Sequence, residues 1–459
     1  MSALGTDRGS STAVATAVAE PASTVASPEA PPVVLVPPAA LAGGGHGAIS
    51  LKNLRTFESL KTPKFRLFYA AMLSQMAAMN MEMVARGLLI YEMTGSGTIL
   101  GVMALANSLP MLFFSLFGGV AADRVHKKYL MIGGQAANSL LALSVALCIT
   151  TSVLSADNDS GVWILIVASL FKGTVQGFMM PARQSIIPEL VPVTQVMNAL
   201  ALNNLGMNLL RLLAPLLAGF AIAFWGYGAV YYIMTGLFIS ATLFSIPLPK
   251  TPFANIQKSQ NRAVTDMANG FRYAAREGTI ALILLFTLFV VLCSMPYMML
   301  LPIFTEDILD VGEKGLGILV SVSGIGAIVG SLVLASLPNR YRGLMLIISS
   351  FILGAALVVF AFSTVWALSL AAIVFVGLGQ AGRMTLSGAL LQSYVSDEYR
   401  GRVMSIYMME FGLTSLSVFA AGVLSDTIGI QWSIGGLAIL LMIACVVTAV
   451  MSPKLRALH

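Results

Sequence analysis

The fold of this chain is decided at Gly118-Gly119-Val120-Ala121-Ala122-Asp123-Arg124-Val125-His126-Lys127-Lys128, a short charged turn between two long apolar runs. Four formal charges fall within the six residues that end at Lys128. The apolar runs on either side are about 20 residues long, which is the length of a membrane-spanning helix. The stretch therefore predicts two consecutive transmembrane helices joined by a tight, charged loop.

The composition extends this prediction to the whole chain. Of its 459 residues, 57% are hydrophobic and 10% are charged, whereas soluble domains carry about 25% charged residues. The mean hydropathy is +0.87. The apolar runs are continuous, unlike the alternating strands of a membrane barrel. The sequence therefore predicts an all-α membrane protein embedded in a lipid bilayer.

Twelve apolar segments of spanning length follow one another, and a polar stretch separates the first six from the last six. This arrangement predicts two pseudo-symmetric six-helix bundles. The expected spans are 66–91, 98–122, 129–152, 161–181, 198–223, 228–248, 279–304, 315–337, 343–362, 366–390, 402–424 and 432–452. The expected domains are a disordered cytoplasmic tail at 1–62, an N-terminal bundle at 63–249, a cytoplasmic linker at 250–278, a C-terminal bundle at 279–453 and a cytoplasmic tail at 454–459.

The loop charges predict the orientation. Lysine and arginine residues gather in the loops on one side, and on the other side Lys314 is the only basic residue among several acidic ones. By the positive-inside rule, both termini and the linker are cytoplasmic and the chain crosses the cell (inner) membrane many times. The loop with Asn339 and Arg340 is a degenerate repeat of the loop with Asp123 and Arg124. Internal repeats of this kind are typical of alternating-access transporters.

Several classes of function have no support in the sequence. The three cysteines lie far apart inside apolar runs and form no metal-binding spacing. A phosphate-binding Gly-x-x-x-x-Gly-Lys-[Ser/Thr] motif is absent, and no nucleophile, base and acid are grouped together. No basic soluble domain is available for nucleic acid. We therefore expect no enzyme, no cofactor, no metal site and no nucleic-acid partner, and we expect a monomer.

The charged turn resembles the loop signature of the major facilitator superfamily, with a histidine where that family usually has glycine. Three further stretches resemble the branch of siderophore exporters and macrolide or multidrug efflux pumps. They are 84–86 together with 91–96, 181–191, and 211–219. The resemblance covers residues 62–452. It implies a secondary active transporter in which spans one, four, seven and ten line a central cavity.

The stretch in span five bears on the direction of transport. Exporters of this superfamily usually carry Gly-Pro-x-x-Gly-Gly there, and this chain has Ala214, Pro215, Ala218 and Gly219 at the matching positions. Small residues and proline allow close helix approach and a bend. The resemblance implies export, and the alternative is an ordinary kinked helix.

Charged residues within spans are costly in a membrane and are functional candidates by default. Five such residues stand out by depth: Glu82, Arg86, Lys172, Arg211 and Glu410. Glu82 and Arg86 are four residues apart and share a helix face. One interpretation is a local ion pair. The other makes Glu82 a proton carrier for which Arg211 competes, so that proton release depends on conformation.

The remaining intramembrane charges admit similar alternatives. Together with the two arginines, Lys172 makes the interior of the N-terminal half net positive, which favours an anionic or zwitterionic amphiphile as substrate. Glu410 either bridges the two halves on the cytoplasmic side or is a buried hydrogen-bonding carboxylate. We expect Arg383, near the inner end of span ten, to extend its charge to the membrane surface.

The charged turn itself is interpreted as a conformational latch. We expect Asp123 to meet Arg183 or the N-terminus of span eleven, where a helix dipole favours a carboxylate. That contact would hold the cytoplasmic side closed and break when substrate is loaded. The residues assigned to the latch are Gly119, Asp123, Arg124, Lys127, Lys128, Arg183, Asn339 and Arg340.

The sequence thus predicts a proton-coupled exporter of small amphiphilic molecules, either drugs or a siderophore-like metabolite, that works by alternating access. One alternative is a lipid-handling or signalling membrane protein on the same fold without proton coupling. A third possibility is an importer. No motif in the sequence identifies the substrate.

Overall fold

A computed structural model of the chain describes residues 58–154, 160–250, 263–337 and 340–458. Most of the expected N-terminal tail, part of the expected linker and Asn339 lie outside these residues. Some side chains within the helices are also left out, among them those of Asp123 and Arg124. The contacts below all lie within the compact unit Arg55–His459.

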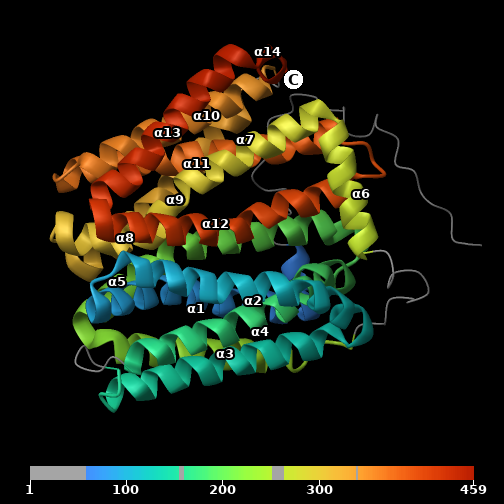
Figure 1. The fold of residues 1–459 in the computed structure, drawn as a ribbon. Helices are drawn as coiled ribbons and strands as arrows, with labels where there is room; N and C mark the ends of the chain where they lie inside the picture. Colours follow the sequence, from blue (N-terminus) through green and yellow to red (C-terminus); the bar gives the residue numbers. More distant parts are fainter. Residues whose placement is uncertain (1–57, 155–159, 251–262, 338–339, 459) are drawn as a thin grey trace, which may run out of the picture. The chain divides into compact units, whose positions relative to one another are not determined.

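The N-terminal half is built of long helices that follow the apolar runs, drawn from blue to green in Figure 1. They are η3 (Glu58–Lys61), α1 (Pro63–Thr94), α2 (Gly97–Arg124), α3 (Lys127–Thr150), α4 (Ser160–Leu190), η4 (Val193–Gln195) and α5 (Val196–Ser245). The 50-residue α5 covers the two expected spans at 198–223 and 228–248, and its backbone is non-helical at Gly226, where φ is 75°. Glycine tolerates this conformation without a Cβ clash, so the chain can turn there.

The C-terminal half, drawn from yellow to red in Figure 1, repeats this pattern. Its helices are α6 (Ala263–Arg276), α7 (Gly278–Ser294), α8 (Pro296–Ile303), the π-helix η5 (Phe304–Ile308), α9 (Gly312–Ser336), α10 (Arg342–Phe362), α11 (Trp366–Tyr394), α12 (Arg400–Ile428), α13 (Ile430–Met451) and α14 (Pro453–Arg456). Helix α6 lies within the stretch expected to be a polar linker. Its Tyr273 stacks on Tyr399 with ring centroids 4.2 Å apart, so α6 is attached to the start of α12.

Ten helical segments of the described chain are long and apolar enough to cross a membrane, and no strand occurs in the described ranges. The 50-residue α5 counts as one of the ten, although its break at Gly226 leaves room for two crossings. Helix α1 is not among them, although it is 32 residues long. The helical membrane fold is therefore confirmed, and the number of twelve spans stays a prediction.

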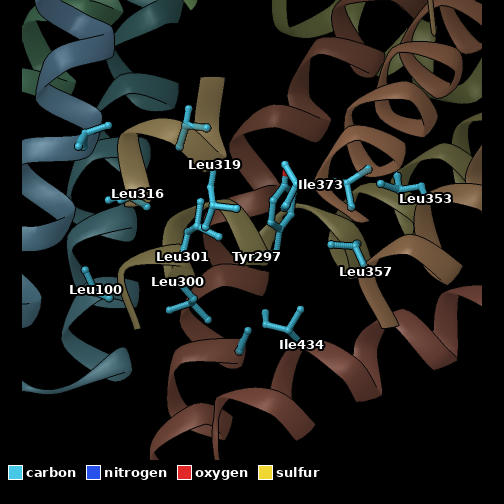
Figure 2. Close-up of a cluster of buried hydrophobic side chains, with 14 of the residues drawn as sticks. Leu100, Tyr297, Leu300, Leu301, Leu316, Leu319, Leu353, Leu357, Ile373 and Ile434 are labelled. Carbon is cyan, nitrogen blue, oxygen red and sulfur yellow. The ribbon is translucent and has the colours of Figure 1, made fainter. Parts of the chain in front are cut away.

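The most extensive contacts between the halves are those of α2 with α12 and of α5 with α9, and α1 and α2 also contact α8. We call the ends of the helices that carry Asp307 and Asp426 the acidic end, and the opposite ends, which carry Lys127 and Arg402, the basic end. One buried apolar cluster contains residues of both halves, and at the junction Leu100 of α2 lies close to Leu316 of α9 (Figure 2). The junction is therefore a continuation of the core.

Candidate functional site

An ion pair lies inside the N-terminal half, between α1 and α4. The Nζ atom of Lys172 contacts Oε2 of Glu82, and the two side chains are only 13% and 12% exposed. The structure therefore pairs Glu82 with a residue from another helix rather than with Arg86, its neighbour on α1. A mostly buried pair of opposite charges avoids the cost of burying either charge alone.

A small cavity adjoins this pair. Arg86, Ser169 and Tyr231 line it together with the two charged residues of the pair, and its volume is about 30 Å³. The Nη1 atom of Arg86 donates a hydrogen bond of 3.5 Å to the Ser169 hydroxyl. A polar cavity of this size can accommodate a water molecule.

Arg211 lies elsewhere, on the face of α5 that turns toward the other half. Its side chain is exposed, as are those of Asn204 and Asn208, which precede it at helical spacing. It acts electrostatically on Tyr297 of α8, whose hydroxyl is 3.5 Å from the Ser323 hydroxyl of α9. In this conformation the described partner of Glu82 is thus the lysine of α4, and Arg211 faces the C-terminal half.

The next turns of α5 form a tight seam with α9. Ala214, Pro215, Ala218 and Gly219 are all buried. A Cβ atom added to Gly219 would lie 2.4 Å from a backbone oxygen of α9, and one added to Gly317 would lie 2.7 Å from the Pro215 oxygen. The exporter-like sequence of span five therefore serves close approach of the two halves.

A second contact between the halves lies at the acidic end, where α12 ends beside the start of α2. The carboxylate of Asp426 accepts hydrogen bonds from the Ser96 hydroxyl at 2.7 Å, the Gly97 N–H at 2.7 Å and the Thr98 N–H at 2.9 Å. These N–H groups belong to the first turn of α2, where helical partners are missing and the helix dipole favours an anion. Asp426 therefore ties the two halves together.

The backbones come very close beside this carboxylate. A Cβ atom on Gly97 would lie 1.9 Å from the Ser425 hydroxyl, and one on Gly422 would lie 2.2 Å from the Gly97 oxygen. A further link is the hydrogen bond that the Tyr91 hydroxyl donates to Asp307. All of these contacts hold the acidic end closed.

The latch expected at the basic end can be followed only in part. Lys127 pairs with Glu189 at the end of α4, within its own half. Arg183 directs Nη1 toward the sulfur of Met76 on α1, at 3.7 Å. The side chains of Asp123 and Arg124 and all of Asn339 lie outside the described residues, and Gly119 is described only as backbone of α2. Lys128 is half-buried and Arg340 is exposed. The latch stays a prediction.

The C-terminal half holds a different buried charge cluster. Glu410 of α12 is 4% exposed, and its Oε1 accepts a hydrogen bond of 2.7 Å from the Thr287 hydroxyl of α7. Arg383 of α11 is 0% exposed. The expectation that this arginine reaches the membrane surface is wrong, because its side chain is fully buried in α11, a helix that packs against α7, α9, α10 and α12.

Several of these features could not be found from the sequence, because the residues that meet in them lie on helices that are distant in the sequence. Asp426 was visible only as a loop acid, Thr287 as one of many threonines, and the two asparagines before Arg211 as ordinary polar residues. Asn204, Asn208 and Arg211 are separated by four and three residues and therefore share one side of a helix. This spacing was the one signal in the sequence that could have identified the exposed polar face of α5. The remaining partners come from helices distant in sequence.

These features define a helical membrane transporter built of two halves that meet at one end. The sequence profile described as "Transmembrane secretion effector" matches residues 54–458. The chain therefore belongs to this family of the major facilitator superfamily, whose members are transporters and not enzymes.

Individual proteins agree with this assignment. The staphyloferrin A transporter of Staphylococcus aureus is 25% identical over 337 residues, which cover 72% of this chain and 82% of that protein. Macrolide efflux protein A of Streptococcus pyogenes is 25% identical over 373 residues, which cover 77% of this chain and 88% of that protein. The crystal structure of the nucleoside transporter NupG has a TM-score of 0.67 at 15% identity, covering 85% and 99% of the two chains, and shows the shared fold alone.

Proposed function

We propose that this protein is a proton-coupled exporter of small amphiphilic molecules, drugs or siderophore-like metabolites, that works by alternating access. The observation that carries the proposal is the exposed Arg211, about 22 Å along α5 by the helical rise. An arginine at such depth is too costly to face lipid and normally faces a water-filled space. The relatives named for efflux of macrolides and transport of staphyloferrin A support this class of substrate.

The surroundings of Arg211 favour an amphiphile with a negative group. Two polar neighbours, Asn204 and Asn208, can accept or donate further hydrogen bonds. Leu205 and Leu209, which are 53% and 50% exposed, continue the same part of α5 as apolar surface. The guanidinium of Arg211 can bind the negative group of an amphiphile, and the two leucines can contact its apolar body. This combination matches an anionic or zwitterionic amphiphile.

Proton coupling is assigned to Glu82. A proton on this carboxylate would neutralise it and release Lys172 from the ion pair, and loss of the proton would restore the pair. Because the two residues belong to α1 and α4, the change would alter how these helices pack. The adjacent cavity offers a route for the proton.

Alternating access then requires the contacts of Asp426 to break so that the acidic end can open. We assign this end to the outside of the cell membrane and both termini to the cytoplasm, in line with the charge asymmetry of the loops. In this assignment the structure corresponds to a state closed to the outside. The monomer is taken to be the working unit.

The test uses everted membrane vesicles, in which an exporter accumulates its substrate. We expect uptake of an anionic amphiphilic dye to require a proton gradient and to collapse with an ionophore. Arg211→Gln should reduce this uptake about tenfold, the effect of losing one charge-assisted interaction, while the exposed Arg456→Gln control should not.

Each alternative has its own outcome in this test. Uptake that persists without a gradient would replace proton coupling with the lipid-handling alternative, and movement out of everted vesicles would indicate an importer. Equal transport of a cationic dye by wild type and Arg211→Gln, with no anionic transport at all, would overturn the substrate class.

A further inference from the structure

The second buried carboxylate, Glu410, is unlike Glu82 because no cation is bonded to it. Its Oε1 accepts one hydrogen bond from Thr287, and its Oε2 has no hydrogen-bond partner among the described residues. The residue is 4% exposed and lies about three turns inside α12. A charged carboxylate in such a place would be left largely uncompensated.

The nearby Arg383 makes no ion pair with Glu410 in the described structure. It is 0% exposed, and within the described chain Nε, Nη1 and Nη2 make no well-aligned hydrogen bond. The guanidinium has the Tyr407 hydroxyl as its hydrogen-bonding neighbour and also acts electrostatically on Glu410. The two opposite charges are therefore near each other but are not joined as an ion pair.

The surroundings of Glu410 contain few groups that could replace this missing partner. Helix α7 contributes the uncharged Thr287, α11 contributes Arg383, and Tyr407 lies one turn away on α12 itself. Among the described residues, no other charged group acts on Glu410. The carboxylate can therefore become stable in two ways, by taking up a proton or by moving into contact with Arg383.

We propose that Glu410 is a second proton-binding site, occupied while the acidic end is closed, and that Arg383 replaces the proton as its partner when the proton leaves. On release, the O–H bond of the carboxylic acid breaks, its electrons stay on the carboxylate and the proton passes to water. The inference deepens the proposed function, because it adds a coupling site in the half of the molecule that lacks Glu82.

Helix α12 connects this site to the contact between the halves. Glu410 and Asp426 are 16 residues apart on one helix, which is about 24 Å. A displacement of α12 that brings Glu410 to Arg383 would also act on the hydrogen bonds that Asp426 accepts from the start of α2. Proton release in the C-terminal half would thus loosen the closed end.

Infrared spectroscopy of the purified full-length protein tests the site without any transport measurement. We expect a band of a protonated carboxylic acid that declines as the pH is raised. Glu410→Gln should remove this band, and Glu82→Gln should leave it. The amide oxygen introduced by Glu410→Gln would still accept from Thr287, so this variant is expected to fold, which its thermal unfolding curve checks.

A matched variant assigns the band independently. Thr287→Val keeps the shape of the side chain but removes the donor to Glu410, so the band should remain and move to higher frequency. A band that survives in Glu410→Gln, or one that does not move in Thr287→Val, would overturn the inference. If the band behaves as expected but everted vesicles show no gradient-dependent uptake, the proton site stands and the proposed exporter function fails.

Discussion

The two halves of the molecule bury the same kinds of charge in opposite ways. In the N-terminal half, Glu82 touches Lys172 and forms an ion pair next to a small cavity. In the C-terminal half, Glu410 accepts a hydrogen bond from one neutral hydroxyl, and the nearby guanidinium of Arg383 has Tyr407 as its neighbour and makes no described ion pair with Glu410. The pairing geometry, and not the residue type, distinguishes the two clusters.

This difference indicates that the two carboxylates have different roles in one conformation. A paired carboxylate is stable when charged, because the lysine offsets the loss of water. An unpaired one is more stable when neutral. With the acidic end closed, we therefore expect the N-terminal site to be without its proton and the C-terminal site to hold one.

The largest effect is expected from breaking the paired site. Lys172→Met leaves Glu82 mostly buried without its cation, a change that typically costs about 3–5 kcal/mol. The double variant Glu82→Gln/Lys172→Met should regain most of this stability, because neither charge remains. Thermal unfolding of the purified protein in detergent measures both.

The Lys172→Met variant also leaves both halves with a buried carboxylate that has no cation bonded to it. In Lys172→Met we expect a second protonated-acid band in the infrared spectrum, now from Glu82. Unchanged stability together with an unchanged spectrum would contradict the description of Glu82 as an ion-paired residue.

An intermediate effect is expected at the contact between the halves. Asp426→Asn keeps the size of the side chain but weakens hydrogen bonds to a charged acceptor, which are worth about 1.5–3 kcal/mol each. The equilibrium should shift toward an open acidic end, and the Glu410 band should fall with it. Spin labels attached to cysteines that replace Trp225 and Thr427 report the distance between the two halves at this end. The partly exposed Cys148 is replaced by alanine so that it does not take up a label.

The matched control for this experiment is Asp397→Asn. The side chain of Asp397 is 88% exposed, lies in the turn before α12 and pairs with Arg400 at the start of that helix. We expect the label distance to be unchanged in the control. A distance that also stays unchanged in Asp426→Asn would mean that the glycine contacts alone hold the acidic end closed.

The smallest effect is expected at Arg383. With a proton on Glu410, removing the guanidinium leaves no uncompensated carboxylate behind, and it also removes the cost of burying a charge. Arg383→Met should therefore change the stability by less than about 1 kcal/mol in the same unfolding assay. A loss as large as that in Lys172→Met would show that the two clusters are equally paired and would remove the contrast between the halves.

The sequence predicted the positions of the helices far better than the contacts between side chains of different helices. The apolar runs located nearly every helix, because lipid requires each span to be continuously apolar and to satisfy its own backbone. Two predictions about local structure were incomplete or wrong. The polar stretch before α7 contains helix α6, which is held by the stacking of Tyr273 on Tyr399, and Arg383 is enclosed by neighbouring helices.

The candidate site could be predicted only as a set of residues. Five intramembrane charges were identified from the sequence, because such residues are rare in apolar runs, and Arg383 was noted but expected at the membrane surface. Their pairing was not, because Lys172 approaches Glu82 from 90 residues further along the chain and Arg211 instead faces Tyr297. Spacing within one helix pointed to Arg86 as the partner of Glu82, since only neighbours on the same helix are visible in a sequence.

The sequence by itself determined that this protein is a helical membrane transporter with a charged turn at Asp123–Lys128 and five charges within its apolar segments. Hydrophobicity is a local property of each segment, so the chain needs no tertiary contact to express it. Only the tertiary structure decided which charges meet, which end of the molecule is closed and which carboxylate lacks a cation. These properties depend on distances of a few ångströms between helices, and packing alone sets those distances.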